Sequence, residues 1–199
     1  MLIVVAPEIS VSNEIVVLNR LFKVGLTCYH LRKPELDFEG HCRYISQIDT
    51  AFHDRIMVHR FHELTKHFNL KGIHFQEEKR RDLGADIDNY IESYNGCIEA
   101  TSSSFHTLDA LNNCTTAFNY HFLSPVFTSV SKEGYKGEGF NVIQCKKKVI
   151  GMGGVTSNNL DTLQELGYQG AAVLGSVWNS KAPVDSFETL QKAYNAYVG

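Results

Sequence analysis

The sequence has few cysteines and prolines, no excess of basic residues and no long hydrophobic run. Its 199 residues include 5 cysteines, an odd number without a C-x-x-C pair, so we expect free thiols in a reducing compartment. A net charge of −3 without a basic stripe gives no sign of a nucleic-acid partner. No apolar run approaches the roughly 20 residues that span a bilayer. These absences favour a cytoplasmic domain without nucleic-acid or membrane partners, and they leave homo-oligomerisation open.

Short apolar runs alternate with helical patterns along the whole chain. This alternation is typical of a parallel α/β fold, and eight strands indicate a closed barrel. We therefore predict one α/β domain over residues 1–199, a compact (β/α)8 TIM barrel with trimmed helices. An open, doubly wound sheet is the alternative, although no G-x-G-x-x-G motif follows the first strand. Strands are expected at residues 2–6, 27–31, 55–58, 72–75, 97–100, 120–123, 149–150 and 171–174, helices at 15–22, 38–48, 61–68, 87–94 and 185–197, and an irregular charged segment at 76–88.

Two glycine-rich strand ends carry the strongest functional signal. Residues 151–155 read GMGGV, and residues 172–176 read AVLGS. Glycine lets the backbone approach a ligand closely, and the N–H groups after such a strand can hold a phosphate without a basic side chain. The last two units of a (β/α)8 barrel often build a phosphate site in this way. The plainer alternative is that the glycines serve tight turns. The predicted phosphate-binding residues are Gly153, Gly154, Gly175 and Ser176.

Basic residues are expected where the second and sixth strands end. Arg32, Lys33 and Lys132 would form a cationic cup at the mouth of the barrel. Such a cup stabilises the negative charge that develops on a leaving pyrophosphate. The alternative is that these residues are ordinary charges at strand ends and in a loop.

Histidines and acids follow the second, third and fourth strands. His30, His59 and His74 come from three successive strands, so they are either a metal site or hydrogen-bonded core groups. Glu77 and Glu78 are better suited to Mg²⁺, which prefers carboxylate oxygens together with phosphate. A solvated charged loop is the alternative for these two acids.

In this order, the motifs resemble those of thiamine phosphate synthase and of the related thiazole tautomerase. The resemblance covers nearly the whole chain. The residues that carry it are YHLRK at 29–33, GIHFQE at 72–77, TSSS at 101–104, LSPVF at 123–127, SK at 131–132, GMGGV at 151–155 and AVLGS at 172–176.

The resemblance implies a TIM barrel that joins hydroxymethylpyrimidine diphosphate to a thiazole phosphate, releasing pyrophosphate with the help of Mg²⁺. The implied partners are therefore phosphorylated heterocycles. By match, Arg32 and Lys132 hold the diphosphate, Ser131 assists, and Thr101 lies near the pyrophosphate. The glycine-rich strand ends hold the thiazole phosphate, and Glu77 or Glu78 falls at a metal-binding position.

Four positions depart from the synthase or the tautomerase pattern. The synthase has Gln where this chain has His30, and Asn-Asp where it has His59 and Arg60, so a metal-binding acid is replaced by a cation. The tautomerase has a histidine where this chain has Pro125. We count His30 among the catalytic candidates and His59 among the substrate-binding ones. A synthase, a tautomerase-like enzyme that moves a proton with a histidine, and a non-catalytic binding protein all remain open.

Overall fold

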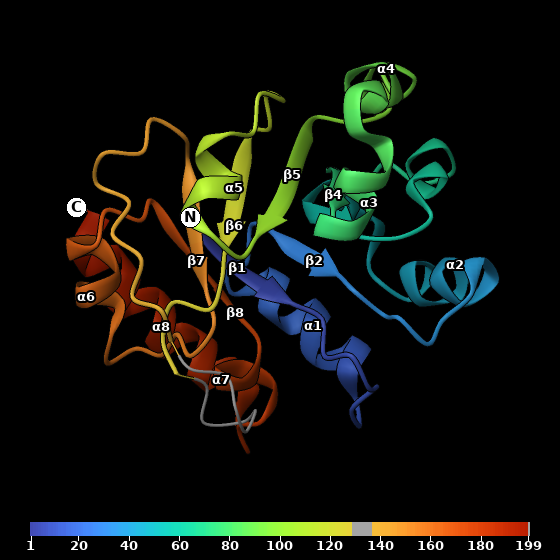
Figure 1. Cartoon of the computed structure of the whole chain (residues 1–199). Coiled ribbons are helices and arrows are strands. Elements are labelled where there is room, and N and C mark those ends of the chain that lie inside the picture. The colour runs from blue at the N-terminus through green and yellow to red at the C-terminus, as the bar shows by residue number, and fades with distance from the viewer. Residues whose placement is uncertain (129–136, 199) are drawn as a thin grey trace.

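Eight parallel strands close into a barrel in chain order (Figure 1). The structure is a computed structural model, and it describes residues 1–128 and 137–198. The predicted single-domain α/β barrel is confirmed. The strands are β1 (Leu2–Val5), β2 (Tyr29–Leu31), β3 (Ile56–Val58), β4 (Gly72–Phe75), β5 (Ala100–Phe105), β6 (Tyr120–Leu123), β7 (Val149–Met152) and β8 (Gly170–Val173).

Helices surround the barrel, and most of them are short, which is how 199 residues complete the fold. The connection between the third and fourth strands has a 3-10 helix in place of an α-helix, and two further 3-10 helices follow α-helices. The α-helices are α1 (Glu14–Lys23), α2 (Phe38–Ser46), α3 (Glu77–Leu83), α4 (Ile87–Glu92), α5 (Leu108–Asn112), α6 (Leu160–Glu165), α7 (Gly175–Trp178) and α8 (Pro183–Val198), and the 3-10 helices are η1 (Thr50–Arg55), η2 (His62–Lys66) and η3 (Gly84–Asp86).

Two sequence predictions of local structure are wrong. The segment 76–88 is not irregular, because α3 has acidic residues in its first turn and arginines in its last turn, an arrangement that favours a helix. The fifth strand begins at Ala100, where the predicted strand ends, so the hydroxyl run at residues 101–104 lies within β5. Polar residues are tolerated there because the barrel interior and the neighbouring residues supply hydrogen-bond partners.

Alternation of side chains along the strands creates two separate cores. The outer core lies between the strands and the helices and includes Leu31, Val58 and Ile73. The inner core fills the barrel and is apolar at its base. Its buried members are Ile3, Val5, Cys28, Met57, Ala100, Tyr120, Phe122, Ile150 and Ala172.

The barrel closes where the first strand meets the last. Leu2 on β1 aligns with Ala171 on β8, and the amino group of Met1 donates a hydrogen bond to the carbonyl of Gln169 at 3.1 Å. The approach is close, since a Cβ atom at Gly170 would lie 2.4 Å from the carbonyl oxygen of Met1. A glycine is therefore required at this seam.

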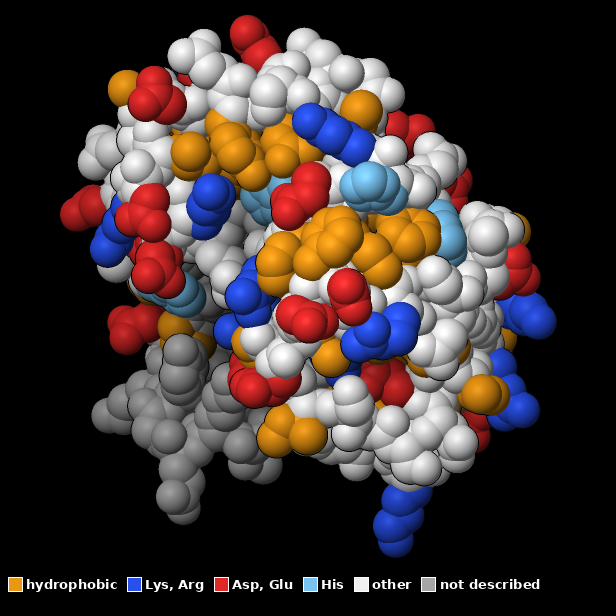
Figure 2. All heavy atoms as spheres, turned by 90° about the vertical axis from the view of Figure 1, so that its right-hand side faces the viewer, with side chains coloured by type: hydrophobic (Ala, Val, Ile, Leu, Met, Phe, Trp, Pro, Cys, Tyr) orange, Lys and Arg blue, Asp and Glu red, His pale blue; other side chains and the backbone are white. Residues whose placement is uncertain are grey.

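The surface on the side of α2, α3 and α4 carries charges of both signs, interspersed with hydrophobic patches (Figure 2). In the part of the chain that the structure describes, no helix has the length and apolar character needed to cross a membrane.

Candidate functional site

A cavity of about 680 Å³ opens at the carboxyl ends of the strands, which is where barrel enzymes build their sites. Its wall has an apolar part, to which Val5, Phe122 and Leu174 contribute, and a polar part. The polar residues come from almost every strand end around the ring. Those used below are Glu8, Arg32, His59, Glu77, Ser104, Gly153, Gly154, Gly175 and Ser176.

The two glycine-rich strand ends lie side by side on the cavity wall, as β7 and β8 are paired. Gly153 and Gly154 have φ values of 98° and 66°, which favour glycine. A Cβ atom at Gly154 would lie 2.8 Å from the carbonyl oxygen of Thr128, so this turn packs tightly against the segment after β6. The hydroxyl oxygen of Ser176 is buried and has no hydrogen-bond partner among the described residues. An oxygen-rich anion would satisfy it.

Arg32 and Lys33 are adjacent in sequence but lie on opposite faces of the barrel wall. Arg32 lines the cavity and forms an ion pair with Glu8, another lining residue. Lys33 is fully buried outside the barrel, 2.7 Å from Glu14, whose carboxylate also accepts a hydrogen bond from Tyr44 at 2.5 Å. The predicted cup therefore includes Arg32 but not Lys33. The prediction placed Lys33 in the cup beside Arg32, but consecutive residues along an extended chain point to opposite faces.

His30, His59 and His74 meet inside the barrel. Nδ1 of His30 lies 2.8 Å from Nε2 of His59, and the rings of His59 and His74 stack with their centroids 4.0 Å apart. Burial lowers the pKa of His30 to about 3. Burial, reinforced by neighbouring histidines and Arg32, holds the pKa of both His59 and His74 well below the usual value. All three imidazoles are therefore neutral at pH 7.

Hydroxyl groups bond to these histidines from the far side of the barrel. Nδ1 and Nε2 of His74 lie 2.8 Å and 2.7 Å from the Oγ atoms of Ser102 and Ser104. Nε2 of His30 lies 2.7 Å from the hydroxyl of Tyr120. Burial raises the pKa of that hydroxyl well above its usual value, so Tyr120 keeps its proton.

The three histidines offer nitrogen atoms within 4.8 Å of one another, the spacing of a metal site. Both ring nitrogens of His30 and His74 already have hydrogen-bond partners, as does Nε2 of His59. Nδ1 of His59 is the exception: it is buried and has no partner among the described residues. A metal ion takes one nitrogen from each ring and would have to displace at least two satisfied contacts, so the arrangement favours hydrogen-bonded neutral histidines over metal ligands.

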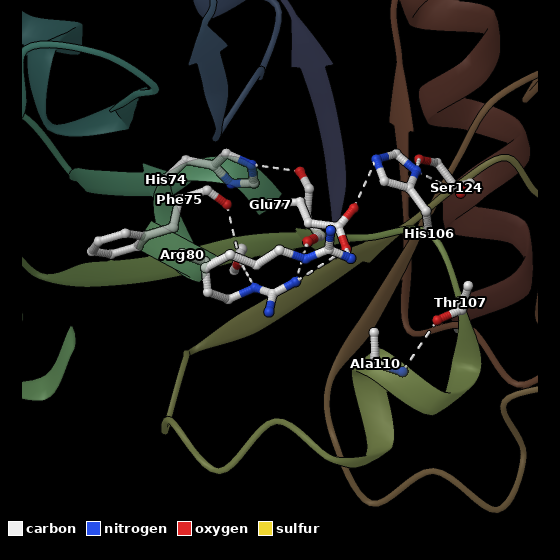
Figure 3. A network of polar contacts seen from close by, with 11 residues as sticks. His74, Phe75, Glu77, Arg80, His106, Thr107, Ala110 and Ser124 are labelled. Carbon is white, nitrogen blue, oxygen red and sulfur yellow. Dashed lines mark hydrogen bonds and ion pairs between the residues drawn. The ribbon is translucent and has the colours of Figure 1, made fainter. Parts of the chain in front are cut away.

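The two predicted acidic metal ligands lie differently from each other. Glu77 lines the cavity, but Arg81 contacts its carboxylate at 2.6 Å, Arg80 at 3.7 Å and His106 at 3.8 Å (Figure 3). Glu78 is exposed and does not line the cavity. Guanidinium groups therefore neutralise both acids that line the described cavity, Glu77 through Arg81 and Arg80 and Glu8 through Arg32, so neither carboxylate fits Mg²⁺.

Thr101 and Arg60 also lie away from the cavity. The hydroxyl of Thr101 donates to Oδ1 of Asn119 at 3.2 Å, on the outer face of β5. Arg60 is exposed and donates to the carbonyl of Pro34 at 2.5 Å. Ser131 and Lys132 lie outside the described residues, so their predicted roles remain predictions.

Sequence reasoning missed the roles of Glu8 and Tyr120. Glu8 belongs to the segment after β1, whose course the sequence does not indicate. Tyr120 could have been found, because it alternates with Phe122 along β6 and so shares its inward face.

Comparisons with known proteins identify the family and support the fold. The family model described as thiamine monophosphate synthase (TMP-TENI) matches residues 1–177. A thiamine phosphate pyrophosphorylase from Bacteroides thetaiotaomicron superposes with a TM-score of 0.77 at 28% identity, covering 98% of this chain and 97% of that one.

Two further solved structures share the fold at lower identity. The thiamine phosphate pyrophosphorylase from Pyrococcus furiosus has a TM-score of 0.79 at 15% identity, covering 100% of this chain and 96% of that one. The 3-hexulose-6-phosphate synthase from Salmonella typhimurium has 0.67 at 10%, covering 98% and 99%. No curated protein matches this chain.

Proposed function

We propose a function for this chain from one premise: it belongs to the thiamine monophosphate synthase (TMP-TENI) family. The proposed reaction joins hydroxymethylpyrimidine diphosphate to a thiazole phosphate and releases pyrophosphate. The supporting observation is that two features suited to anions share one cavity. The glycine-rich ends of β7 and β8 lie on its wall together with Arg32.

Each part of the cavity has a distinct task in the proposed reaction. The glycine turns and Ser176 would hold the thiazole phosphate and fix the ring for attack on the pyrimidine methylene carbon. Arg32 would meet the charge that grows on the pyrophosphate oxygens as the C–O bond breaks. Lys132 and Ser131 are expected to join Arg32. Positioning and charge stabilisation supply most of the acceleration, because a dissociative reaction needs little covalent help from the protein.

Family members of this kind use Mg²⁺, but the described carboxylates of this chain do not fit the ion. Glu77 is bound by arginines, and Arg60 stands where the synthase pattern has an acid. The proposed reaction therefore includes no step at a metal ion.

A tautomerase-like reaction on a thiazole phosphate is the second candidate. The observation that favours it is the neutral, buried His59, which lines the cavity and has an unpartnered ring nitrogen. Such a group exchanges a proton with a bound ring more readily than it stabilises a diphosphate.

The two candidates are separated by a pyrophosphate-release assay with both heterocyclic phosphates. Release that requires both substrates supports the synthase. If the thiazole phosphate binds but no pyrophosphate appears, at any Mg²⁺ concentration, the synthase proposal fails and the second candidate stands.

A further inference from the structure

The charge of Arg32 is already paired inside the cavity. Among the described residues that line the cavity, Arg32 is the one lysine or arginine. Its guanidinium forms an ion pair with the carboxylate of Glu8, another lining residue. A carboxylate and a phosphate group compete for the same guanidinium, because both accept its parallel N–H bonds. An anion that binds at Arg32 must therefore displace the carboxylate of Glu8.

The ion pair is built into the fold, because the two segments that carry it are held together from behind. Glu8 and Arg32 follow β1 and β2, which are neighbours in the sheet. On the outer side of the barrel wall, the buried carboxylate of Glu14 contacts Lys33, the residue after Arg32, at 2.7 Å. The same carboxylate accepts a hydrogen bond from the backbone N–H of Val11, in the segment that carries Glu8, at 3.2 Å. One buried acid therefore keeps the two segments adjacent.

The side chains of the pair can still separate when a ligand enters. The side chain of Glu8 is 42% exposed and that of Arg32 is 32% exposed. Ion pairs with this exposure contribute little to stability, so the Glu8 carboxylate can turn into water at small cost. Because it remains attached to the chain, it also stays near Arg32 at a high effective concentration. Glu8 is thus a tethered competitor that a weakly bound anion does not displace.

The glycine turns differ from Arg32 in this respect. Gly153, Gly154 and Gly175 bring backbone to the cavity wall, and the nearby hydroxyl of Ser176 has no hydrogen-bond partner among the described residues. Backbone N–H groups attract an anion through partial charges, without a counter-charge that has to leave first. A monophosphate that enters the cavity therefore meets one feature that is open to it and one cation that is masked.

We propose that Glu8 is a specificity-determining residue that sorts phosphorylated ligands within the cavity. It keeps monophosphates away from Arg32 and gives way to a diphosphate, which has more charge and more oxygen atoms and so competes better for the guanidinium. A monophosphate is thereby directed to the glycine turns. When a diphosphate leaves, the Glu8 carboxylate returns to Arg32 and hinders its rebinding.

This role of Glu8 rests on the proposed function, in which two phosphorylated substrates occupy different places in one cavity. Without sorting, the monophosphate would also bind at Arg32 and block the diphosphate. The masking of Arg32 is itself a binding property, so it can be measured without turnover.

The test is a double-mutant cycle between Glu8 and Arg32, with inorganic phosphate and pyrophosphate as probes. Calorimetry measures the affinity of both probes for the unaltered protein, Glu8→Gln, Arg32→Ala and the double variant. Glu8→Gln removes the charge and keeps the size of the side chain, and Glu8→Ala removes the competing group entirely. The matched control is Glu39→Gln, which removes the same charge from an acid that pairs with Arg43 at 3.6 Å on the exposed face of α2.

Masking predicts that the two probes depend on Arg32 differently. In the unaltered protein and in Glu39→Gln, adding Arg32→Ala should weaken pyrophosphate binding about tenfold or more and inorganic phosphate binding less than about twofold. In Glu8→Gln and Glu8→Ala, inorganic phosphate should bind about tenfold more tightly, and adding Arg32→Ala should abolish this gain. The dependence on Arg32 separates masking from a general change in charge, which the control shares.

Three results would overturn this role of Glu8. The first is inorganic phosphate binding that already depends on Arg32 in the unaltered protein. The second is phosphate affinity that does not rise in either Glu8 variant, or that rises independently of Arg32. The third is weaker pyrophosphate binding in both Glu8 variants, because Glu8 would then hold Arg32 in place for the ligand. A failed pyrophosphate-release assay together with the expected phosphate pattern would instead remove the proposed function and leave the masking of Arg32 in place.

Discussion

The two halves of this barrel mouth reach a ligand in opposite ways. On the side of β7 and β8, the backbone itself lines the cavity at Gly153, Gly154 and Gly175. On the side of β2 to β6, side chains fill the interior and bond to one another across the barrel, as His30 does to Tyr120, 90 residues further along. The glycine half is built from short local segments, whereas the histidine half exists only when distant strands are in register.

This difference separates the tasks that each half can perform. Backbone N–H groups carry a fixed partial charge and do not titrate, so the glycine half is suited to holding an anion. Neutral imidazoles and hydroxyls both donate and accept, so the histidine half is suited to moving or sharing a proton. Arg32 is a cation of the described cavity wall, and in the proposed reaction it would meet the developing charge.

The largest effect is expected at Arg32. Arg32→Ala should lower pyrophosphate-release turnover about 10²-fold, because it removes a cation that meets transition-state charge. The thermal midpoint should change little, because the side chain is 32% exposed. Arg43→Ala is the matched control, since Arg43 also pairs with a glutamate but on the exposed face of α2. Near-normal turnover of Arg32→Ala would place the diphosphate elsewhere.

The histidine half should make the fold sensitive to acid. The pKa of His30 is about 3 in the folded protein against 6.5 when unfolded, so between these values the unfolded state binds a proton that the native state does not. Stability is therefore lost as the pH falls below 6.5. The loss is about 1.4 kcal/mol per pH unit for this one group, or about 2 kcal/mol by pH 5.

His30→Gln should remove that part of the acid sensitivity, because an amide offers a donor and an acceptor but does not titrate. Urea unfolding at pH 6.5 and pH 5 measures the difference, with His67→Gln at an exposed position as the control. An equally steep loss in both variants would mean that water protonates His30 inside the folded barrel.

A side chain added to the glycine half should weaken phosphate binding for steric reasons. Gly154→Val should weaken binding of thiazole phosphate at least tenfold, about 1.4 kcal/mol. A β-branched side chain resists a φ of 66°, and its Cβ would lie 2.8 Å from the carbonyl oxygen of Thr128. Gly96→Val is the control, since its φ is also positive, at 80°, but nothing lies within 4 Å of the added carbon. Calorimetry that shows equal affinity for Gly154→Val and the unaltered protein would contradict the phosphate site.

The smallest effect is expected at Arg60. Arg60→Ala should change stability by less than about 0.5 kcal/mol and leave the Mg²⁺ response of pyrophosphate release unaltered, because the side chain lies on the surface over Phe61. A clear gain in Mg²⁺-dependent release would show that Arg60 reaches the cavity during turnover.

Local signals made the barrel and its glycine turns predictable. Apolar strands and glycine turns each depend on a few consecutive residues, so the sequence alone predicts their number and order. It was harder to predict which side of the barrel wall each polar residue at a strand end faces. The alternation of side chains explains the result: Arg32, His59 and Ser104 point inward, while Lys33 and Arg60 point outward. What the sequence could not supply is register, which decides that Tyr120 meets His30 and not another inward residue.

The pairing of β1 with β8 leaves one edge of the first strand unpaired while the chain is being synthesised. The edge of β1 that pairs with β8 finds no partner until Ala171 has been synthesised, because Leu2 aligns with that residue. A ribosome adds about 5–20 residues per second, so the apolar edge of the first strand waits on the order of ten seconds in the nascent chain. Chaperones that cover exposed strand edges would act in that interval. A ribosome that stalls before the eighth strand would release an open, aggregation-prone sheet.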